Sequence, residues 1–141
     1  MNRSPDNSRS ISVFVVEDSP IIRDVLTQRL EDDSRFSVVG HADTAHDTIA
    51  ALKQLGLLDI LVLDLQLKQG TGYDVLAYLR SARAPSELQA VVLTNYASPA
   101  YRQRAIALGA SGFFDKSMEF DKMLHGLRLW ADEKVGKAGN H

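Results

Sequence analysis

The sequence contains no cysteine among its 141 residues, which excludes disulfide bonds, thiolate nucleophiles and cysteine-based metal sites. It has no apolar run approaching the roughly 18 residues that a membrane-spanning helix requires. Basic residues are not in excess: 16 lysines and arginines against 18 acidic residues give a formal net charge of −2. The chain therefore lacks the basic field typical of general nucleic-acid binding. What is present, 45% hydrophobic and 24% charged residues, is typical of a soluble globular domain.

The two ends of the chain also lack the features of a targeting segment. The first ten residues, MNRSPDNSRS, are polar with no apolar core, so they are not a signal peptide. The last residues are polar and contain glycine, which is typical of a frayed end. We therefore expect one cytoplasmic domain at residues 11–131, between flexible tails at residues 1–10 and 132–141.

Apolar runs and amphipathic segments alternate along the chain. The apolar runs predict strands at residues 11–16, 36–40, 60–65, 90–94 and 111–114. Helical periodicity predicts helices at residues 20–31, 44–55, 73–83, 99–108 and 118–130. The third apolar run is unbroken, which indicates a strand buried on both faces of a parallel sheet. This order predicts an α/β fold in which a five-stranded parallel sheet carries helices on both faces.

Polar side chains stand at the ends of four of the five expected strands. Glu17 and Asp18 follow the first strand, Asp64 interrupts the third, Thr94 ends the fourth, and Lys116 follows the fifth. In open parallel sheets, ligands bind at the carboxyl ends of the strands, where the strand order reverses. We therefore expect these side chains to converge on one site.

Neighbouring carboxylates at such a site would repel one another. Two of them about 4 Å apart repel by roughly 4 kcal/mol at an effective dielectric constant of 20. The cluster persists only if one group is protonated, a lysine pairs with it, or a divalent cation binds. Oxygen ligands favour a hard ion such as Mg²⁺. A carboxylate between Mg²⁺ and Lys116, with the Thr94 hydroxyl nearby, can attack a phosphoryl group, and Asp64 is the best nucleophile candidate.

Four segments together resemble the receiver domain of bacterial two-component response regulators. They are VFVVEDSP at 13–20, ILVLDLQLKQGTG at 60–72, VVLTNYA at 91–97 and GASGFFDKS at 109–117. The resemblance covers roughly residues 11–130. It implies a flavodoxin-like fold with strand order 2-1-3-4-5. It also implies a signalling domain rather than an enzyme. The only chemistry of such a domain is Mg²⁺-dependent self-phosphorylation and autodephosphorylation.

The resemblance assigns roles to individual residues. Asp64 would be the phosphoacceptor, and Lys116 would contact the phosphoryl group. Thr94 and Phe113 would be the switch residues that respond to phosphorylation. The groups that would hold Mg²⁺, or Mn²⁺ in its place, are the carboxylates of Glu17, Asp18 and Asp64 and the backbone carbonyl of Gln66.

The same resemblance implies partners. A sensor histidine kinase or a histidine phosphotransfer protein would donate the phosphoryl group to Asp64. Phosphorylation would then switch a surface that binds a downstream effector protein, and homodimerisation on phosphorylation is a further expectation. We expect neither membrane contact nor direct nucleic-acid contact within this chain.

The sequence departs from the family pattern at two places where relatives have proline. Ser117 stands where the family often has a proline, with a cis peptide, after the lysine. Lys68 stands where many relatives have a proline in the loop after the phosphoacceptor, so this loop is expected to be more mobile. A cis bond before a non-proline residue costs about 2.5–4 kcal/mol, so we predict a trans Lys116–Ser117 bond.

Other functions remain as alternatives. A haloacid-dehalogenase-like phosphatase also uses an Asp nucleophile with Mg²⁺, but it needs a second Asp where this chain has Gln66. A flavodoxin-type flavin carrier cradles phosphate with hydroxyls and amides, whereas the segment EDSP presents negative charge. Within the receiver family, the eleven residues after Trp130 are too few for a helix-turn-helix, so we expect a stand-alone receiver. The alternative is a receiver fragment of a DNA-binding transcriptional regulator.

Overall fold

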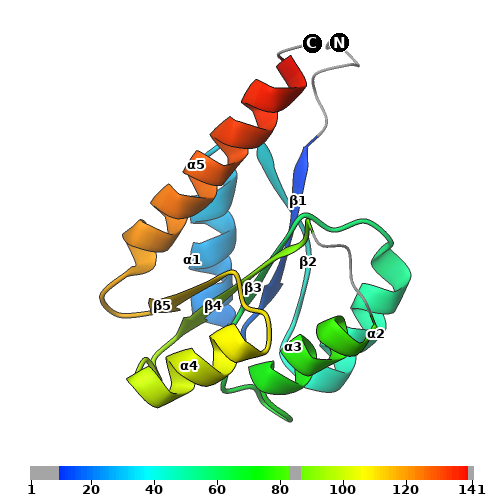
Figure 1. Ribbon diagram of the computed structural model, residues 1–141, viewed down its shortest axis with the longest axis vertical. Coiled ribbons are helices and arrows are strands. Elements are labelled where there is room, and N and C mark those ends of the chain that lie inside the picture. Colours follow the sequence, from blue (N-terminus) through cyan, green and yellow to red (C-terminus); the bar gives the residue numbers. More distant parts are fainter. Residues whose placement is uncertain (1–9, 83–86, 140–141) are drawn as a thin grey trace.

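The computed structural model describes residues 10–82 and 87–139, the side chains of residues 135–139 excepted. Along this part of the chain, five strands alternate with five helices (Figure 1). The elements are β1 (Ile11–Val16), α1 (Pro20–Glu31), β2 (Phe36–Ala42), α2 (Ala45–Leu55), β3 (Ile60–Leu63), α3 (Gly72–Ser81), β4 (Gln89–Thr94), α4 (Pro99–Ala107), β5 (Gly112–Asp115) and α5 (Phe120–Gly139). None of the described helices is long and apolar enough to span a bilayer.

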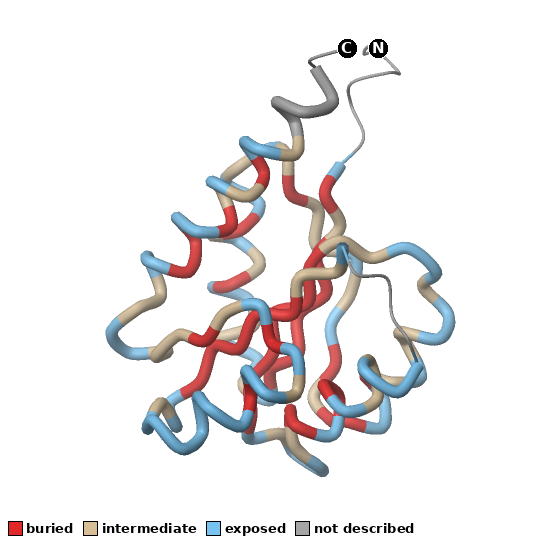
Figure 2. Tube along the Cα trace, viewed as in Figure 1, coloured by how far each residue is buried: buried red, intermediate tan, exposed pale blue. Residues whose placement is uncertain are grey.

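The strands form one parallel sheet in the order β2-β1-β3-β4-β5. This confirms the predicted fold class and strand order. All four residues of β3 are buried, and the buried positions run through the centre of the sheet (Figure 2). The last residues of β1 and β3, Val16 and Leu63, are paired in register. The residues that follow these two strands therefore start from adjacent points on the same edge of the sheet.

Helices cover both faces of the sheet. α1 and α5 lie on one face, and α2, α3 and α4 lie on the other (Figure 1). Each layer has its own hydrophobic cluster. Val13 and Val15 of β1 belong to the cluster under α1 and α5, while Phe14 and Val16 belong to the opposite one. This alternation follows from the two-residue period of a strand, and it explains why both faces of β1 carry apolar residues from Val13 to Val16.

Capping side chains start the two helices that follow the acidic strand ends. Ser19 Oγ accepts from the N–H of Ile22 at 3.3 Å, and Pro20 opens α1, as the sequence predicts. Before α3, the N–H of Thr71 donates to Asp74 Oδ2 at 2.9 Å, and the N–H of Asp74 donates to Thr71 Oγ1 at 3.3 Å. Both helices therefore begin at defined points close behind the acidic residues.

Several element ends differ from the prediction by about two residues. β2 continues to Ala42, and β3 ends at Leu63, so Asp64 lies just beyond the strand instead of within it. α3 ends at Ser81 rather than at residue 83. Strand and helix ends are the positions that sequence patterns define least well.

The prediction that the last helix ends at Trp130 was wrong, because α5 continues to Gly139. Polar composition suggests a tail at 132–141, but it also suits the exposed side of a helix. Ala131 is fully buried, and Asp132 Oδ1 accepts from Arg35 Nη1 at 2.6 Å, so packing and an ion pair extend the helix. The domain boundaries stay a prediction. Residues 1–9 of the expected N-terminal tail and residues 140–141 of the expected C-terminal tail lie outside the described residues.

Gly72 at the start of α3 lies directly against the chain that carries Asp64. A Cβ added at Gly72 would collide with the backbone oxygen of Asp64 and come within 3.1 Å of the Cα of Leu65. The N–H of Gly72 donates to the carbonyl of Leu65 at 2.9 Å, so the two segments cannot separate without losing this hydrogen bond. Close packing of α3 on the site loop therefore requires glycine at this position.

We predict that Gly72→Ala lowers the free energy of unfolding by about 1–3 kcal/mol, because the added methyl group forces two backbone segments apart. Urea denaturation followed by circular dichroism measures this change. Gly126→Ala in α5 is the matched control, since nothing lies within 4 Å of a Cβ added there. Alanine is favoured over glycine inside a helix by up to about 1 kcal/mol, so this control should not lose stability. A Gly72→Ala protein as stable as the wild type would contradict the close packing.

Candidate functional site

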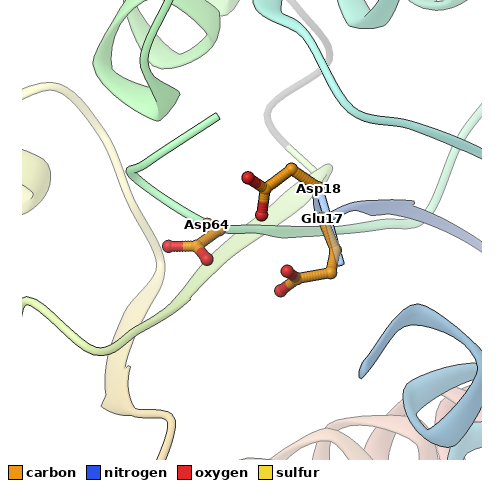
Figure 3. A group of neighbouring side chains, drawn as sticks. All are labelled: Glu17, Asp18 and Asp64. Atoms are coloured by element: carbon orange, nitrogen blue, oxygen red, sulfur yellow. The ribbon is translucent and has the colours of Figure 1, made fainter. Parts of the chain in front are cut away.

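Three carboxylates meet at the carboxyl ends of β1 and β3. Glu17 and Asp18 follow β1, Asp64 follows β3, and each offers an oxygen within 4.8 Å of the other two (Figure 3). The N–H of Asp64 donates to the carbonyl of Val16 at 3.0 Å, which continues the β1–β3 pairing into the site. Glu17 is 2% and Asp64 5% exposed, while Asp18 is exposed. Two carboxylates are thus buried, and the third faces solvent.

Lys116, which follows β5, connects the two buried carboxylates. Its Nζ donates to Asp64 Oδ2 at 2.5 Å and to Glu17 Oε1 at 2.8 Å. Its backbone N–H donates to the carbonyl of Thr94 at 2.8 Å, which ties the start of the loop to the end of β4. The predicted convergence of strand ends is therefore present for the three acids and the lysine.

Backbone groups satisfy the remaining oxygens of the buried carboxylates. Glu17 Oε2 accepts from the N–H of Ser19 at 3.0 Å, and Asp64 Oδ1 accepts from the N–H of Gln66 at 3.3 Å. The second bond places Gln66 beside the cluster. The assignment of its carbonyl as a metal ligand stays a prediction.

Burial and ion pairing act in opposite directions at this site. Burial raises the pKa of Glu17 above its ordinary value of 4.5, and the hydrogen bonds from Lys116 and Ser19 only partly offset this effect. Burial alone would lower the pKa of Lys116, but its hydrogen bonds to Asp64 and Glu17 raise that pKa above 10.5. Lys116 therefore stays charged at neutral pH. One ammonium among three carboxylates leaves a negative excess that suits a hard divalent cation with oxygen ligands.

The two predicted switch residues, Thr94 and Phe113, are both buried. Thr94 is fully buried, and its Oγ1 accepts from the N–H of Tyr96 at 3.1 Å. Phe113 is 2% exposed, within the cluster under α2–α4. Their contribution to signalling stays a prediction.

Sequence reasoning missed the contacts of the arginines on α4, whose pattern indicates only a solvated face. The guanidinium of Arg102 lies 5.1 Å from the ring centre of Phe113, and its Nη2 donates to the carbonyl of Phe113 at 3.2 Å. The guanidinium of Arg104 lies 4.1 Å from the ring centre of Tyr73. Both pairs join different elements, so no local sequence spacing could have indicated them.

The Lys116–Ser117 bond is trans, as predicted, and no cis peptide occurs among the described residues. Lys68, the second position where relatives often have proline, is held by a backbone hydrogen bond: its N–H donates to the carbonyl of Asp43 at 2.9 Å. The expected mobility of this loop stays a prediction.

Comparison with known proteins decides the family. The family model of the response regulator receiver domain matches residues 13–128. The chain belongs to this family. This receiver domain is 26% identical over 118 residues to the transcriptional regulatory protein DesR of Bacillus subtilis, covering 84% of the chain and 57% of DesR. It is 36% identical over 130 residues to a protein-glutamate methylesterase/protein-glutamine glutaminase of Symbiobacterium thermophilum, covering 92% of the chain and 34% of that protein.

Solved structures agree with this assignment. The signal receiver domain of the response regulator NarL of Mycobacterium tuberculosis superimposes with a TM-score of 0.78 at 25% identity, over 88% of this receiver domain and 98% of that chain. The receiver domain described here spans between about a third and three-fifths of the length of the curated relatives named above. Their activities in transcriptional regulation or as a methylesterase are therefore not assigned to it.

We predict that Glu17→Gln stabilises the metal-free protein increasingly as the pH rises above 4.5. The folded-state pKa of Glu17 is raised, so the unfolded chain loses this proton first, and wild-type folding is penalised as the pH rises through the folded-state value. Glutamine has no such titration. The difference in free energy of unfolding between the two proteins, measured with urea in EDTA between pH 4 and pH 8, should therefore grow and then level off. A difference independent of pH would contradict the raised pKa.

Proposed function

We propose that Asp64 accepts a phosphoryl group from the phosphohistidine of a sensor histidine kinase or a histidine phosphotransfer protein. The observation that carries the proposal is the position of its carboxylate, which lies at the end of the central strand, 2.5 Å from Lys116 Nζ and beside two further acids. In the transfer, an Asp64 oxygen forms a bond to phosphorus while the bond from phosphorus to the imidazole nitrogen breaks. The electron pair stays on the imidazole, and an acyl phosphate results.

Lys116 supplies the fixed positive charge for this step. Its ammonium already contacts Asp64 and Glu17 in a site with little solvent, so it needs no large rearrangement to face the transferring oxygens. Glu17, Asp18 and Asp64, with the Gln66 carbonyl, would hold Mg²⁺, or Mn²⁺ in its place. A bound cation of this kind neutralises negative charge on phosphoryl oxygens.

The proposed response passes through Thr94 and Phe113. Phosphorylation adds roughly 1.5–2 negative charges beside the end of β4, where the Thr94 hydroxyl can donate to the new oxygens. Movement of Thr94 frees space for Phe113 to turn, and any such turn changes the stacking of Arg102 of α4 on its ring. The surface around α4 would then shift between two populations and alter binding of a downstream effector or of a second copy.

The donor protein would dock where apolar side chains flank the acidic cluster. Ile21, in the first turn of α1, is 76% exposed, and Met118, two residues after Lys116, is 81% exposed. Both follow directly on segments that carry the site, so a partner covering them brings its phosphohistidine near Asp64. A cytoplasmic location, where such a donor would be encountered, stays a prediction.

Output by protein–protein contact, from a stand-alone receiver, is the form we propose. A receiver that belongs to a DNA-binding regulator is the alternative, favoured by the names and greater length of relatives such as DesR. The intact mass of the protein isolated from its own cells separates the two, because a DNA-binding regulator would exceed the 15.6 kDa of this chain.

We predict that incubation with acetyl phosphate and Mg²⁺ adds one phosphoryl group, about 80 Da, to the wild-type protein. Asp64→Asn should gain nothing, because its amide is not a nucleophile. Asp24→Asn, an exposed position on α1, is the matched control and should be modified like the wild type. Intact-protein mass spectrometry measures all three. Equal modification of Asp64→Asn and the wild type would contradict the assignment of the phosphoacceptor.

A further inference from the structure

Asp115, the last residue of β5, makes hydrogen bonds to the loop that follows it through both its side chain and its backbone. Its Oδ1 accepts from the N–H of Ser117 at 2.8 Å and from the N–H of Met118 at 3.2 Å. Its carbonyl accepts from the N–H of Glu119 at 2.8 Å, and its own N–H donates to Glu119 Oε1 at 2.9 Å. Four hydrogen bonds thus join Asp115 to residues 117–119. Lys116 is the first residue of the loop that they close.

The same loop is attached to the end of β4. The N–H of Lys116 donates to the carbonyl of Thr94, and Ser117 Oγ lies in hydrogen-bond contact with Asn95 Oδ1 at 3.2 Å. The backbone of Lys116 is therefore held from both sides. Its side chain must still span the distance to two buried carboxylates, so small movements of the loop would change both of its ion pairs.

The bond from Ser117 depends on the amino acid at that position. A proline has no N–H, so the Asp115–Ser117 bond exists only because residue 117 is not proline. Where a proline ring would restrict the backbone covalently, this chain restricts it with the carboxylate of Asp115. The carboxylate of Asp115 thus binds the backbone of the loop, and Asp115 directly precedes Lys116, whose charge the site requires.

We propose that Asp115 is a positioning residue for phosphoryl transfer to Asp64. It fixes the loop so that Lys116 Nζ stays between Asp64 and Glu17. The proposal rests on the proposed function only in that Lys116 acts in the transfer. The position of Lys116 itself can be measured without any phosphoryl donor.

The first experiment observes the Lys116 ammonium by NMR in the full chain without Mg²⁺. The protons of a buried ammonium that donates two hydrogen bonds exchange slowly with water. The signal that disappears in Lys116→Arg is assigned to the Lys116 ammonium. Asp115→Ala should lose this slowly exchanging signal. Asp115→Asn, which keeps the acceptor oxygen, should retain it. Asp121→Ala is the control. The carboxylate it removes, in the first turn of α5, accepts from Arg29 and not from the Lys116 loop, so the signal should stay unchanged.

The second experiment measures phosphorylation by acetyl phosphate with saturating Mg²⁺. Asp115→Ala should lower the maximal rate about tenfold, since misplacing a catalytic group by about 1 Å costs up to a hundredfold. Asp115→Asn should stay within about twofold of the wild type by the same reasoning. Asp115→Glu keeps the charge but moves the acceptor, so it should share the defect of Asp115→Ala and serves if the alanine variant does not fold.

The outcomes separate the two proposals. Asp115→Ala or Asp115→Glu with the wild-type signal and rate would overturn the positioning role. Asp115→Asn as defective as Asp115→Ala would also overturn it, because the charge and not the bond would then be responsible. Failure of the wild type to form an aspartyl phosphate would refute the proposed function, while the NMR comparison would still decide whether Asp115 positions Lys116.

Discussion

The ammonium group shared by Asp64 and Glu17 is the interaction on which the rest of the site depends. Both carboxylates are almost completely buried, and an isolated buried charge costs several kcal/mol. Lys116 bonds both at short distance and remains charged because of them. Burial still raises the pKa of Glu17, because the hydrogen bonds from Lys116 and Ser19 offset it only in part. Under the proposed function, the three carboxylates would hold a divalent cation and, with it, an anionic phosphoryl group that the carboxylates alone would repel.

Sheet topology creates this arrangement from residues that are distant in sequence. Lys116 is separated by 52 residues from Asp64 and by 99 from Glu17. The parallel order brings the ends of β1 and β3 together, and β4 and β5 continue the same edge. Helix packing then fixes the loops: α3 presses Gly72 against Asp64, and the hydrogen bonds of Asp115 close the loop before α5. The site therefore exists only in the folded chain.

The sequence indicated the parts of this account that depend on strand ends. Polar residues at the ends of apolar runs, Glu17, Asp64 and Lys116, were sufficient to predict a parallel sheet and the acid–lysine cluster, while the strand order was implied by the family resemblance. The extension of α5 was not predictable from its polar residues, because Ala131 and the Asp132–Arg35 pair become visible only in three dimensions. The stacking of Arg102 on Phe113 was not predictable for the same reason. Contacts between elements are not encoded in local periodicity, and they decide the details around the site.

The central claim is that Lys116 makes two buried carboxylates tolerable, and the stability of Lys116→Met tests it most directly. In urea unfolding at pH 7 with EDTA, this variant should lose about 3 kcal/mol, because buried acids remain without a partner. Lys122→Met is the matched control, since its ammonium is exposed and lies 3.5 Å from Glu119. It should change by less than about 0.5 kcal/mol. A Lys116→Met protein as stable as the wild type would contradict the account.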